Sequence, residues 1–346
     1  MAHIVVIYNS VPDRNALTHD LRSELGVLQV AEGVAAALRQ MHQVSLVPFT
    51  GDVILLAEQL RKAKPDAVFN LFEGAFGFSQ SEVFVPITLD LLGIPFTGSP
   101  AKTLEVCVQK SLTKKILLRR SVPTPRFQVF DIGAPIATDL PFPLLVKPER
   151  EDASLGISND SVVRSESELR RQVEFIWKQF SQPALCEEFI DGREFNVAIL
   201  GDPDYERFIG HPFAPKVLPI SEISFESLPE GYPRVVSYKA KWEELSLEYQ
   251  GTKPICPAPI EPKLEAQLRQ LAMSAFHALG CRDYARIDFR YSQSGQLFVI
   301  DVNPNPDISP DAGFARSAKV GGYDYSALIQ TIADFALNRK RQLRDD

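Results

Sequence analysis

The stretch YARIDFRYSQSGQLFVIDVN (284–303) consists of two apolar runs around SQSG, which is typical of a hairpin turn. Asp288 lies in the first run, and Asp301 and Asn303 lie in the second. Because side chains alternate across a strand, Asp301 and Asn303 share one face, and a tight hairpin places Asp288 opposite them. The sequence therefore predicts that three oxygen-bearing side chains converge on one side of an antiparallel pair.

These three side chains suit a hard divalent cation. Mg²⁺, or Mn²⁺ in its place, takes carboxylate and amide oxygens and leaves its other positions to phosphate and water. The alternative is a polar strand edge whose carboxylates are simply solvated. Ile287, Phe289, Ile300 and Val302 flank the polar positions, so we expect half-buried strands. Burial favours the metal site, because an unpaired buried charge is costly.

Towards the amino terminus, the first hundred residues alternate apolar strand-like runs with helical patterns. This alternation predicts a parallel sheet with crossover helices. The start of the chain, MAHIVVIYNS, reads as a first strand and not as a signal peptide, because it has no basic segment and its apolar run is short. The predicted strands are IVVIY (4–8), VSLVPF (44–49), AVFNLF (67–72) and IPFTGS (94–99), with helices over 30–38 and 55–60.

The rest of the chain predicts mixed α+β units. A lysine-rich helix ends before VPTP (122–125), and strands then flank a helix over 166–180. Two helices, over 312–319 and 325–337, follow the hairpin, and the charged tail KRQLRDD (340–346) is expected to be solvated. The fold class is thus α/β and α+β, with three expected domains: a Rossmann-like parallel-sheet domain over 1–100, then 101–186 and 187–346.

Composition excludes several classes of function. The 346 residues are 45% hydrophobic and carry a formal net charge of −7, which argues against a nucleic-acid groove. No segment is long and apolar enough to span a bilayer. The four cysteines are widely separated and the histidines do not cluster at zinc-ligand spacing, so we expect a reduced, cytoplasmic compartment.

Three lysines stand at strand ends or on helices: Lys110, Lys147 in LLVKP and Lys241 in YKAKW. A lysine there can deliver a positive charge to a triphosphate, although an isolated lysine is more often a solvated surface charge. EEFIDGREF (187–195) resembles a hinge between two strands. Its backbone could pair with an adenine edge, and Glu194 could accept from ribose hydroxyls. Each feature alone is common, but their order along the chain indicates a nucleotide-binding site: two lysines, the acidic hinge, a third lysine, then Arg286 and the hairpin with its carboxylates.

That order resembles the ATP-grasp superfamily, and specifically the D-alanine–D-alanine ligase family. The similarity covers residues from about 97 to 337. The matching segments are TGSPAKTLEVCVQK, PLLVKPEREDASLG, CEEFIDGREFNVAIL, SYKAKWEELSLEY, and GCRDYARIDFR through FVIDVNPNPDISP. The resemblance implies an ATP-grasp fold, the cofactors ATP and Mg²⁺, and a ligase that joins a carboxylate to an amine through an acyl-phosphate. It also suggests a homodimer.

The resemblance also implies roles for individual residues. Arg286 would steady the acyl-phosphate and the tetrahedral intermediate by fixed positive charge. The remaining positions are Lys110, Lys147 and Lys241 for the phosphates, Glu187, Phe189 and Ile190 for adenine, Glu194 for ribose, and Asp288, Asp301 and Asn303 for the metal.

Departures from the family pattern fall where the amino acids would bind. In the phosphate-covering loop Asp152, Ala153 and Ser154 replace Gly-Ser-Ser, so Ser154 carries the remaining hydroxyl. Trp242 replaces a tyrosine. In the amino-terminal part, IYNSVPDRN replaces a glutamate signature, and Glu73 and Glu82 are the acids left in NLFEGAFGFSQSE.

Ala312 and Gly313 replace the serine and leucine that would hold a second carboxylate, and Asp307 and Asp311 lie beside them. An acidic pocket repels a carboxylate and favours a cation, so we expect a changed amine substrate. Alternatively, Asp307 and Asp311 cap the following helix.

Three other functions stay open at this point. The first is authentic D-alanine–D-alanine synthesis. The second is a nucleotide-binding regulatory module without turnover, against which the retained metal positions and Arg286 argue. The third is a dehydrogenase, which is disfavoured because no GxGxxG follows the first strand.

Overall fold

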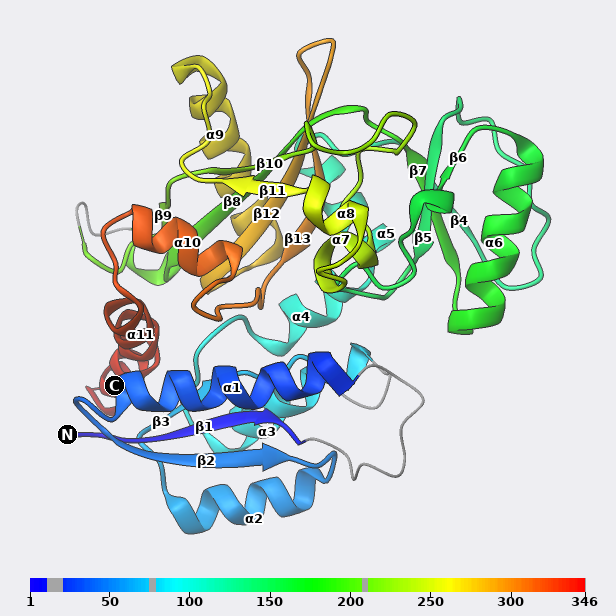
Figure 1. The fold of residues 1–346 in the computed structure, drawn as a ribbon. Helices are drawn as coiled ribbons and strands as arrows, with labels where there is room; N and C mark the ends of the chain where they lie inside the picture. Colours follow the sequence, from blue (N-terminus) through cyan, green and yellow to red (C-terminus); the bar gives the residue numbers. More distant parts are fainter. Residues whose placement is uncertain (11–20, 75–78, 207–210, 346) are drawn as a thin grey trace.

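The computed structural model describes residues 1–10, 21–74, 79–206 and 211–345, and they build three β-sheets (Figure 1). The first sheet has the order β2-β1-β3 and is entirely parallel. Its strands are β1 (His3–Asn9), β2 (Gln43–Phe49) and β3 (Ala67–Asn70), and its helices are α1 (Leu21–Leu38), α2 (Val53–Ala63) and α3 (Phe84–Leu92). The predicted parallel sheet is thereby confirmed.

The predicted fourth strand, 94–99, is wrong. Only Phe96 forms a bridge, to Val68. The chain then turns at Gly98, which has a φ of +89° and donates its N–H to the carboxylate of Asp283 at 2.8 Å. This hydrogen bond holds the chain at the turn where its pairing with β3 stops.

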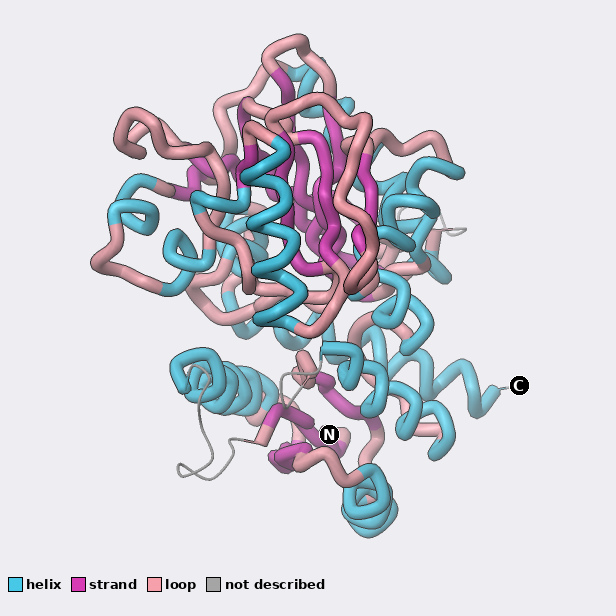
Figure 2. Tube along the Cα trace, turned by 90° about the vertical axis from the view of Figure 1, so that its right-hand side faces the viewer, coloured by secondary structure: helices cyan, strands magenta, loops and turns pink. Residues whose placement is uncertain are grey.

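The second sheet is antiparallel and has the order β4-β7-β5-β6. Its strands are β4 (Phe127–Phe130), β5 (Leu144–Pro148), β6 (Val162–Val163) and β7 (Ala184–Glu188). Helix α6 (Glu166–Phe180) begins at Ser165, whose hydroxyl accepts from the N–H of Glu168, and it buries Leu169, Val173 and Ile176 against this sheet. Figure 2, viewed from the side where α6 lies in Figure 1, shows a helix across these strands.

The third sheet has the order β11-β10-β8-β12-β13, and β9 pairs with β8. Its strands are β8 (Gly192–Gly201), β9 (Lys216–Val217), β10 (Ser221–Ser224), β11 (Lys253–Ile255), β12 (Asp283–Ser292) and β13 (Leu297–Asn303). The predicted hairpin over 284–303 is β12 and β13. The remaining helices of the chain are α4 (Ala101–Val108), α5 (Lys110–Arg119), α7 (Tyr238–Trp242), α8 (Leu247–Gly251), α9 (Pro262–Leu279), α10 (Gly313–Val320) and α11 (Tyr325–Asp345). Residues 340–345 extend α11, where the sequence predicted a solvated tail.

The central strands of the third sheet have two chemically different faces. On one face Phe195, Ile287, Phe289 and Val302 are buried against Phe276 and other apolar side chains of α9. The other face is polar and lines a cavity. A strand that must bury alternate residues has no freedom to rotate, so the packing on α9 fixes which residues face the cavity.

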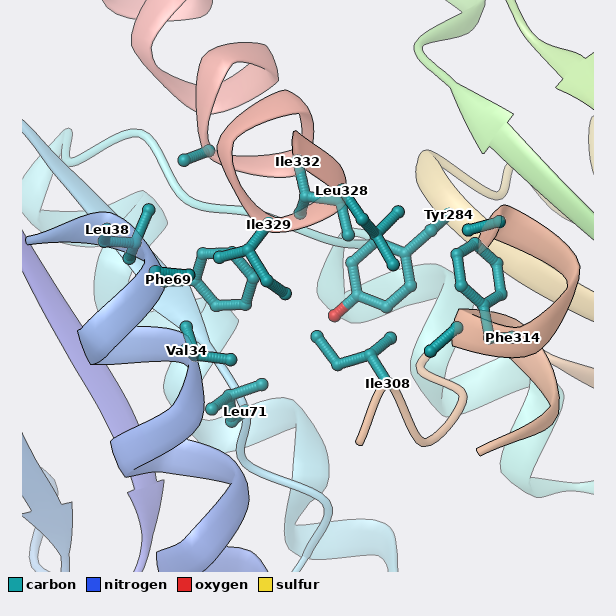
Figure 3. Packing of buried hydrophobic residues seen from close by; sticks show 14 of the residues in the cluster. Val34, Leu38, Phe69, Leu71, Tyr284, Ile308, Phe314, Leu328, Ile329 and Ile332 are labelled. Atoms are coloured by element: carbon teal, nitrogen blue, oxygen red, sulfur yellow. The ribbon is translucent and has the colours of Figure 1, made fainter. Parts of the chain in front are cut away.

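The first and third sheets share a hydrophobic core, shown in Figure 3. Val34 and Phe69 come from the first unit, Leu328 and Ile332 from α11, and Phe314 from α10. The first sheet is therefore held against the third by apolar packing, which accounts for most of the favourable free energy of such contacts. Among the described residues, no helix combines the length and apolar composition needed to cross a bilayer.

A buried ionic network reinforces this junction. The guanidinium of Arg339 contacts the carboxylate of Asp202 at 2.5 Å and both oxygens of Asp283 at 2.8 and 2.7 Å. It also donates to the carbonyl of Phe96 at 2.6 Å. Asp202 and Asp283 are both 0% exposed, and Arg339 is the cation that forms ion pairs with both of them.

We predict that Arg339→Met lowers the free energy of unfolding by about 3–5 kcal/mol, because it leaves two buried carboxylates unpaired. Urea denaturation followed by circular dichroism measures this. Arg171→Met, at an exposed position of α6, is the matched control and should change stability by less than about 0.5 kcal/mol. A loss below about 1 kcal/mol for Arg339→Met would show that the network contributes little.

Burial raises the pKa of Glu82 to about 8, although Asn305 donates to its carboxyl at 2.9 Å. The folded protein therefore holds a proton on Glu82 that the unfolded chain releases near its ordinary value of 4.5. Between these values, raising the pH lowers the free energy of unfolding, by up to about 1.4 kcal/mol per pH unit.

We predict that Glu82→Gln, which keeps an acceptor for Asn305 and cannot ionise, has a shallower loss of stability from pH 5 to 8 than the parent protein. Urea denaturation across this range measures it, with exposed Glu105→Gln as the control. Parallel profiles for the parent protein and Glu82→Gln would contradict the buried, protonated state.

Candidate active site

The polar face of β8, β12 and β13 forms the floor of a cavity of about 1050 Å³. This volume is at the upper end for small-molecule sites and accommodates a nucleotide together with a second ligand. β5 and β7 of the second sheet close one side, and the segments 153–157, 227–254 (which includes α7 and α8) and 307–313 close others. The floor residues are Glu194 and Asn196 from β8, Arg286, Asp288 and Arg290 from β12, and Asp301 and Asn303 from β13.

A β-bulge determines which side chains of β13 point into the cavity. Asp288 pairs with Asp301, but the next residue of β12, Phe289, pairs with Val299, so Ile300 is an extra residue. Because of this insertion, Val299 and Val302 are both buried towards α9 while Asp301 still faces the cavity. Bulges commonly re-aim side chains in this way beside functional sites.

The three predicted metal-binding residues lie together. Asp288 and Asp301 are cross-strand partners, and the amide of Asn303 donates to Asp288 Oδ2 at 3.2 Å. Asp288 Oδ1 also accepts from Asn196 and Arg286, both at 2.8 Å, and Oδ2 accepts from Arg286 at 2.8 Å. These four hydrogen bonds fill the four acceptor positions of the carboxylate.

A cation could therefore bind Asp288 only if one donor moves away. Asn303 makes the longest of the four contacts, and turning its amide would present an oxygen instead of an N–H. Two carboxylates and an amide then fit Mg²⁺, with phosphate and water at its other positions. In the described part of the chain no three acidic, histidine or cysteine side chains form a metal cluster.

Asp301 is surrounded by positive charge. Lys110 lies 3.4 Å from Asp301 and 3.1 Å from Asp152 in the loop over the cavity. Burial alone would raise the pKa of Asp301, but Lys110, Lys147 and Arg286 outweigh it and lower that pKa. The Asp301 carboxylate is therefore ionised, as a metal ligand must be.

Lys147 and Glu187 form a buried cluster with a residue that the sequence analysis did not single out, Lys114. Glu187 is 1% exposed, and its two oxygens lie 2.8 Å from the ammonium of Lys147 and 2.5 Å from that of Lys114. Burial acts to raise the pKa of Glu187, but the two lysines lower it overall. Lys114 lies four residues after Lys110 on α5, a helical spacing that could have revealed it.

The other predicted nucleotide contacts also line the cavity: Phe189, Ile190 and Glu194. The backbone N–H of Phe189 donates to the carbonyl of Pro143 at 3.1 Å, which fixes the hinge after β7. Glu194 forms an ion pair with Arg290, 2.8 Å from its Nη2, a second residue that the sequence analysis did not predict. Arg290 lies two positions after Asp288, so strand alternation could have identified it.

The loop over the cavity has an unusual backbone. Ala153 and Ser154 have positive φ values of 53° and 62°, which are costly for residues with a Cβ and persist only when neighbours enforce them. The indole N–H of Trp242 donates to the carbonyl of Ala153 at 3.1 Å and thus ties the loop to α7. Ser154 and the ring of Trp242 both line the cavity.

Lys241 reaches the same cavity from α7. Its ammonium lies 5.1 Å from the centroid of the Trp242 ring. Burial and the neighbouring charge of Arg286 lower the pKa of Lys241. An ammonium group whose charged form is disfavoured in this way is stabilised when an anionic ligand binds beside it.

The acids near α10 do not cap that helix. Its N-cap, Ala312, makes no side-chain cap, and the carboxylate of Asp307 instead accepts from the N–H and hydroxyl of Ser309 at 2.8 and 2.7 Å. Asp311 is exposed. The capping alternative is therefore wrong, and both carboxylates line the cavity.

Glu73 lies three residues after the end of β3. Desolvation and the charge of Asp307 raise the pKa of Glu73 to about 7, although its side chain keeps contact with solvent. IYNSVPDRN (7–15), which replaces the glutamate signature, extends partly beyond the described residues.

Comparisons with known proteins agree with this architecture. The family model described as D-ala D-ala ligase C-terminus matches residues 125–334. An uncharacterized protein of Sinorhizobium fredii, y4sG, is 36% identical over 90% of this chain and 88% of its own length. The D-alanine–D-alanine ligase of Sphingopyxis alaskensis is 31% identical over 90% of this chain and 92% of its own length.

The D-alanine–D-alanine ligase of Bacillus anthracis, in a crystal structure with ATP, superposes with a TM-score of 0.76 at 21% identity and covers 99% of both chains. This likeness shows a shared fold, and it confirms the expected ATP-grasp architecture. The family model and the relatives agree in the same direction, so the chain belongs to the D-alanine–D-alanine ligase family.

Proposed function

We propose that the protein is an ATP-dependent ligase that joins a carboxylate to an amine through an acyl-phosphate. The observation that carries the proposal is that Asp288, Asp301, Asn303 and Lys147 line one cavity, with the ammonium group of Lys110 3.4 Å from Asp301. A triphosphate with a divalent cation needs this combination of carboxylate oxygens and separate positive charges. Relatives named D-alanine–D-alanine ligase support it.

In this proposal the nucleotide lies between the second and third sheets. Phe189, Ile190 and Glu187 contact the adenine, and Glu194 accepts from the ribose hydroxyls. Lys110, Lys147 and Lys241 contact the phosphates, and Ser154 contributes its hydroxyl from the loop above. Asp288, Asp301 and Asn303 hold Mg²⁺, which when bound neutralises phosphate charge and orients the terminal phosphate.

The chemistry requires fixed positive charge near the reacting phosphate. The substrate carboxylate attacks the terminal phosphorus, ADP leaves, and the amine then attacks the acyl carbon and displaces phosphate. Negative charge develops on oxygen in both steps. Arg286, held by two hydrogen bonds to Asp288, and Lys241 supply cations that need no reorganisation when this charge appears.

Changed amine specificity is supported by the charges at the far end of the cavity. Asp307 and Asp311 line the cavity beside Ala312 and Gly313, where the family pattern holds a carboxylate. These groups favour an amine that bears an additional cationic group. The second candidate, authentic D-alanine–D-alanine synthesis, is favoured by the names of several relatives. The expected homodimer and cytoplasmic location stay predictions.

Lys147→Ala should weaken binding of ATP at least about tenfold, because it removes a buried charge beside the phosphates. Glu187 keeps Lys114 as a partner, so the variant should fold. Isothermal titration calorimetry with Mg²⁺ and ATP measures the loss, and exposed Lys263→Ala is the matched control. Equal affinity in all three proteins would contradict the phosphate role.

A phosphate-release screen of D-alanine, other amino acids and diamines, with ATP and Mg²⁺, tests the function itself. We predict phosphate release with a substrate pair whose amine is dicationic. The ratio of its rate to the rate with D-alanine should be at least about tenfold lower in Asp311→Asn than in the parent protein. Asp139→Asn, an exposed control, should keep the preference. Preference for D-alanine alone would establish the second candidate, and release with no pair would contradict ligase activity.

A further inference from the structure

Arg290 is a buried arginine on the floor of the cavity that the proposed chemistry does not use. Its side chain is 4% exposed in total, and it lies directly opposite Glu194 in the pairing of β12 with β8. Its Nη2 is 2.8 Å from Oε2 of Glu194. The two side chains thus form a cross-strand ion pair that water barely reaches.

The guanidinium is held on several sides by the protein itself. It donates to the carbonyl of Gly192 at 3.3 Å and to the carbonyl of Arg234. Its central carbon lies 5.2 Å from the ring centroid of Phe225 and 5.9 Å from that of Phe189. An arginine with its donors engaged in this way is poorly placed to bind phosphate, but it is well placed to fix a carboxylate.

Glu194 needs such a partner. Its side chain is buried, and burial together with the charge of Asp288 raises its pKa, an effect that Arg290 opposes. The ion pair engages Oε2, and Glu194 lines the cavity. An ionised carboxylate accepts hydrogen bonds at both oxygens, whereas a protonated one would present an O–H donor.

We propose that Arg290 is a positioning residue: its ion pair fixes the orientation of the Glu194 carboxyl group so that Glu194 selects a nucleotide carrying ribose hydroxyls. This inference rests on the proposed function, because it requires ATP to bind in this cavity. Arg290 acts only through Glu194 and touches no part of the nucleotide. Its link to Arg234 also fastens the segment that lines the cavity at Val235 and Val236.

The test compares ATP with 2′-deoxy-ATP and 3′-deoxy-ATP, by calorimetry on the full chain with Mg²⁺. A hydrogen bond to a charged group contributes enough for the parent protein to prefer ATP at least about tenfold over one of the deoxy nucleotides. In Arg290→Met that preference should fall to about twofold or less, while affinity for the deoxy nucleotide changes little. A merely structural role would weaken all three nucleotides equally.

Further variants test whether the effect of Arg290→Met comes from misfolding or from a direct contact between Arg290 and the nucleotide. In Glu194→Gln the preference should also be lost, and adding Arg290→Met to it should change the preference no further, since both act through one contact. This double variant leaves no unpaired buried charge. Arg193→Met, which breaks an ion pair with Glu222 outside the cavity, should keep the full preference.

The proposal is overturned if Arg290→Met keeps the full preference for ATP, if it weakens all three nucleotides equally, or if its effect adds to that of Glu194→Gln. It is also overturned if the parent protein binds ATP and both deoxy nucleotides equally. Failure of the parent protein to bind any of the three would instead contradict the proposed function itself.

Discussion

The alternation of side chains on β8, β12 and β13 is the constraint on which the rest of the structure depends. Apolar residues such as Phe195, Ile287 and Phe289 must pack against α9, so their neighbours must face the opposite way. The positions of the polar side chains are therefore fixed by the hydrophobic packing on the other side of the same strands. Burial of each such side chain is worth about 1.5–3 kcal/mol, which is sufficient to hold charged residues in a cavity.

The charged side chains on that face stabilise one another as ion pairs. Several lysine and arginine side chains lie where the phosphates are proposed to bind. Glu187 forms ion pairs with two lysines, and the acceptor positions of Asp288 are filled by Arg286, Asn196 and Asn303. Such buried pairs add little net stability, but they fix geometry. The occupied state of Asp288 means that ligand binding must exchange hydrogen bonds for metal coordination.

Much of this site could be predicted from the sequence, because period-two patterning in a hairpin places Asp288, Asp301 and Asn303 together without knowledge of the remaining fold. The bulge at Ile300 could not, since an extra residue inside the apolar run QLFVI leaves no sign in the pattern. Helical spacing places Lys114 on the same face of α5 as Lys110, but its ion pair with Glu187 depends on how α5 docks against the second sheet, which no local pattern encodes. The failed strand at 94–99 has the same origin, a tertiary contact with Asp283.

The most direct test of the central claim is a crystal structure with Mg²⁺ and a non-hydrolysable ATP analogue. Our account predicts a cation about 2.1 Å from oxygens of Asp288, Asp301 and Asn303, with Asn303 turned away from its present hydrogen bond. It also predicts the phosphates beside Lys110 and Lys147. A nucleotide bound elsewhere, or bound here while Asp288 keeps all four of its present hydrogen bonds, would contradict it.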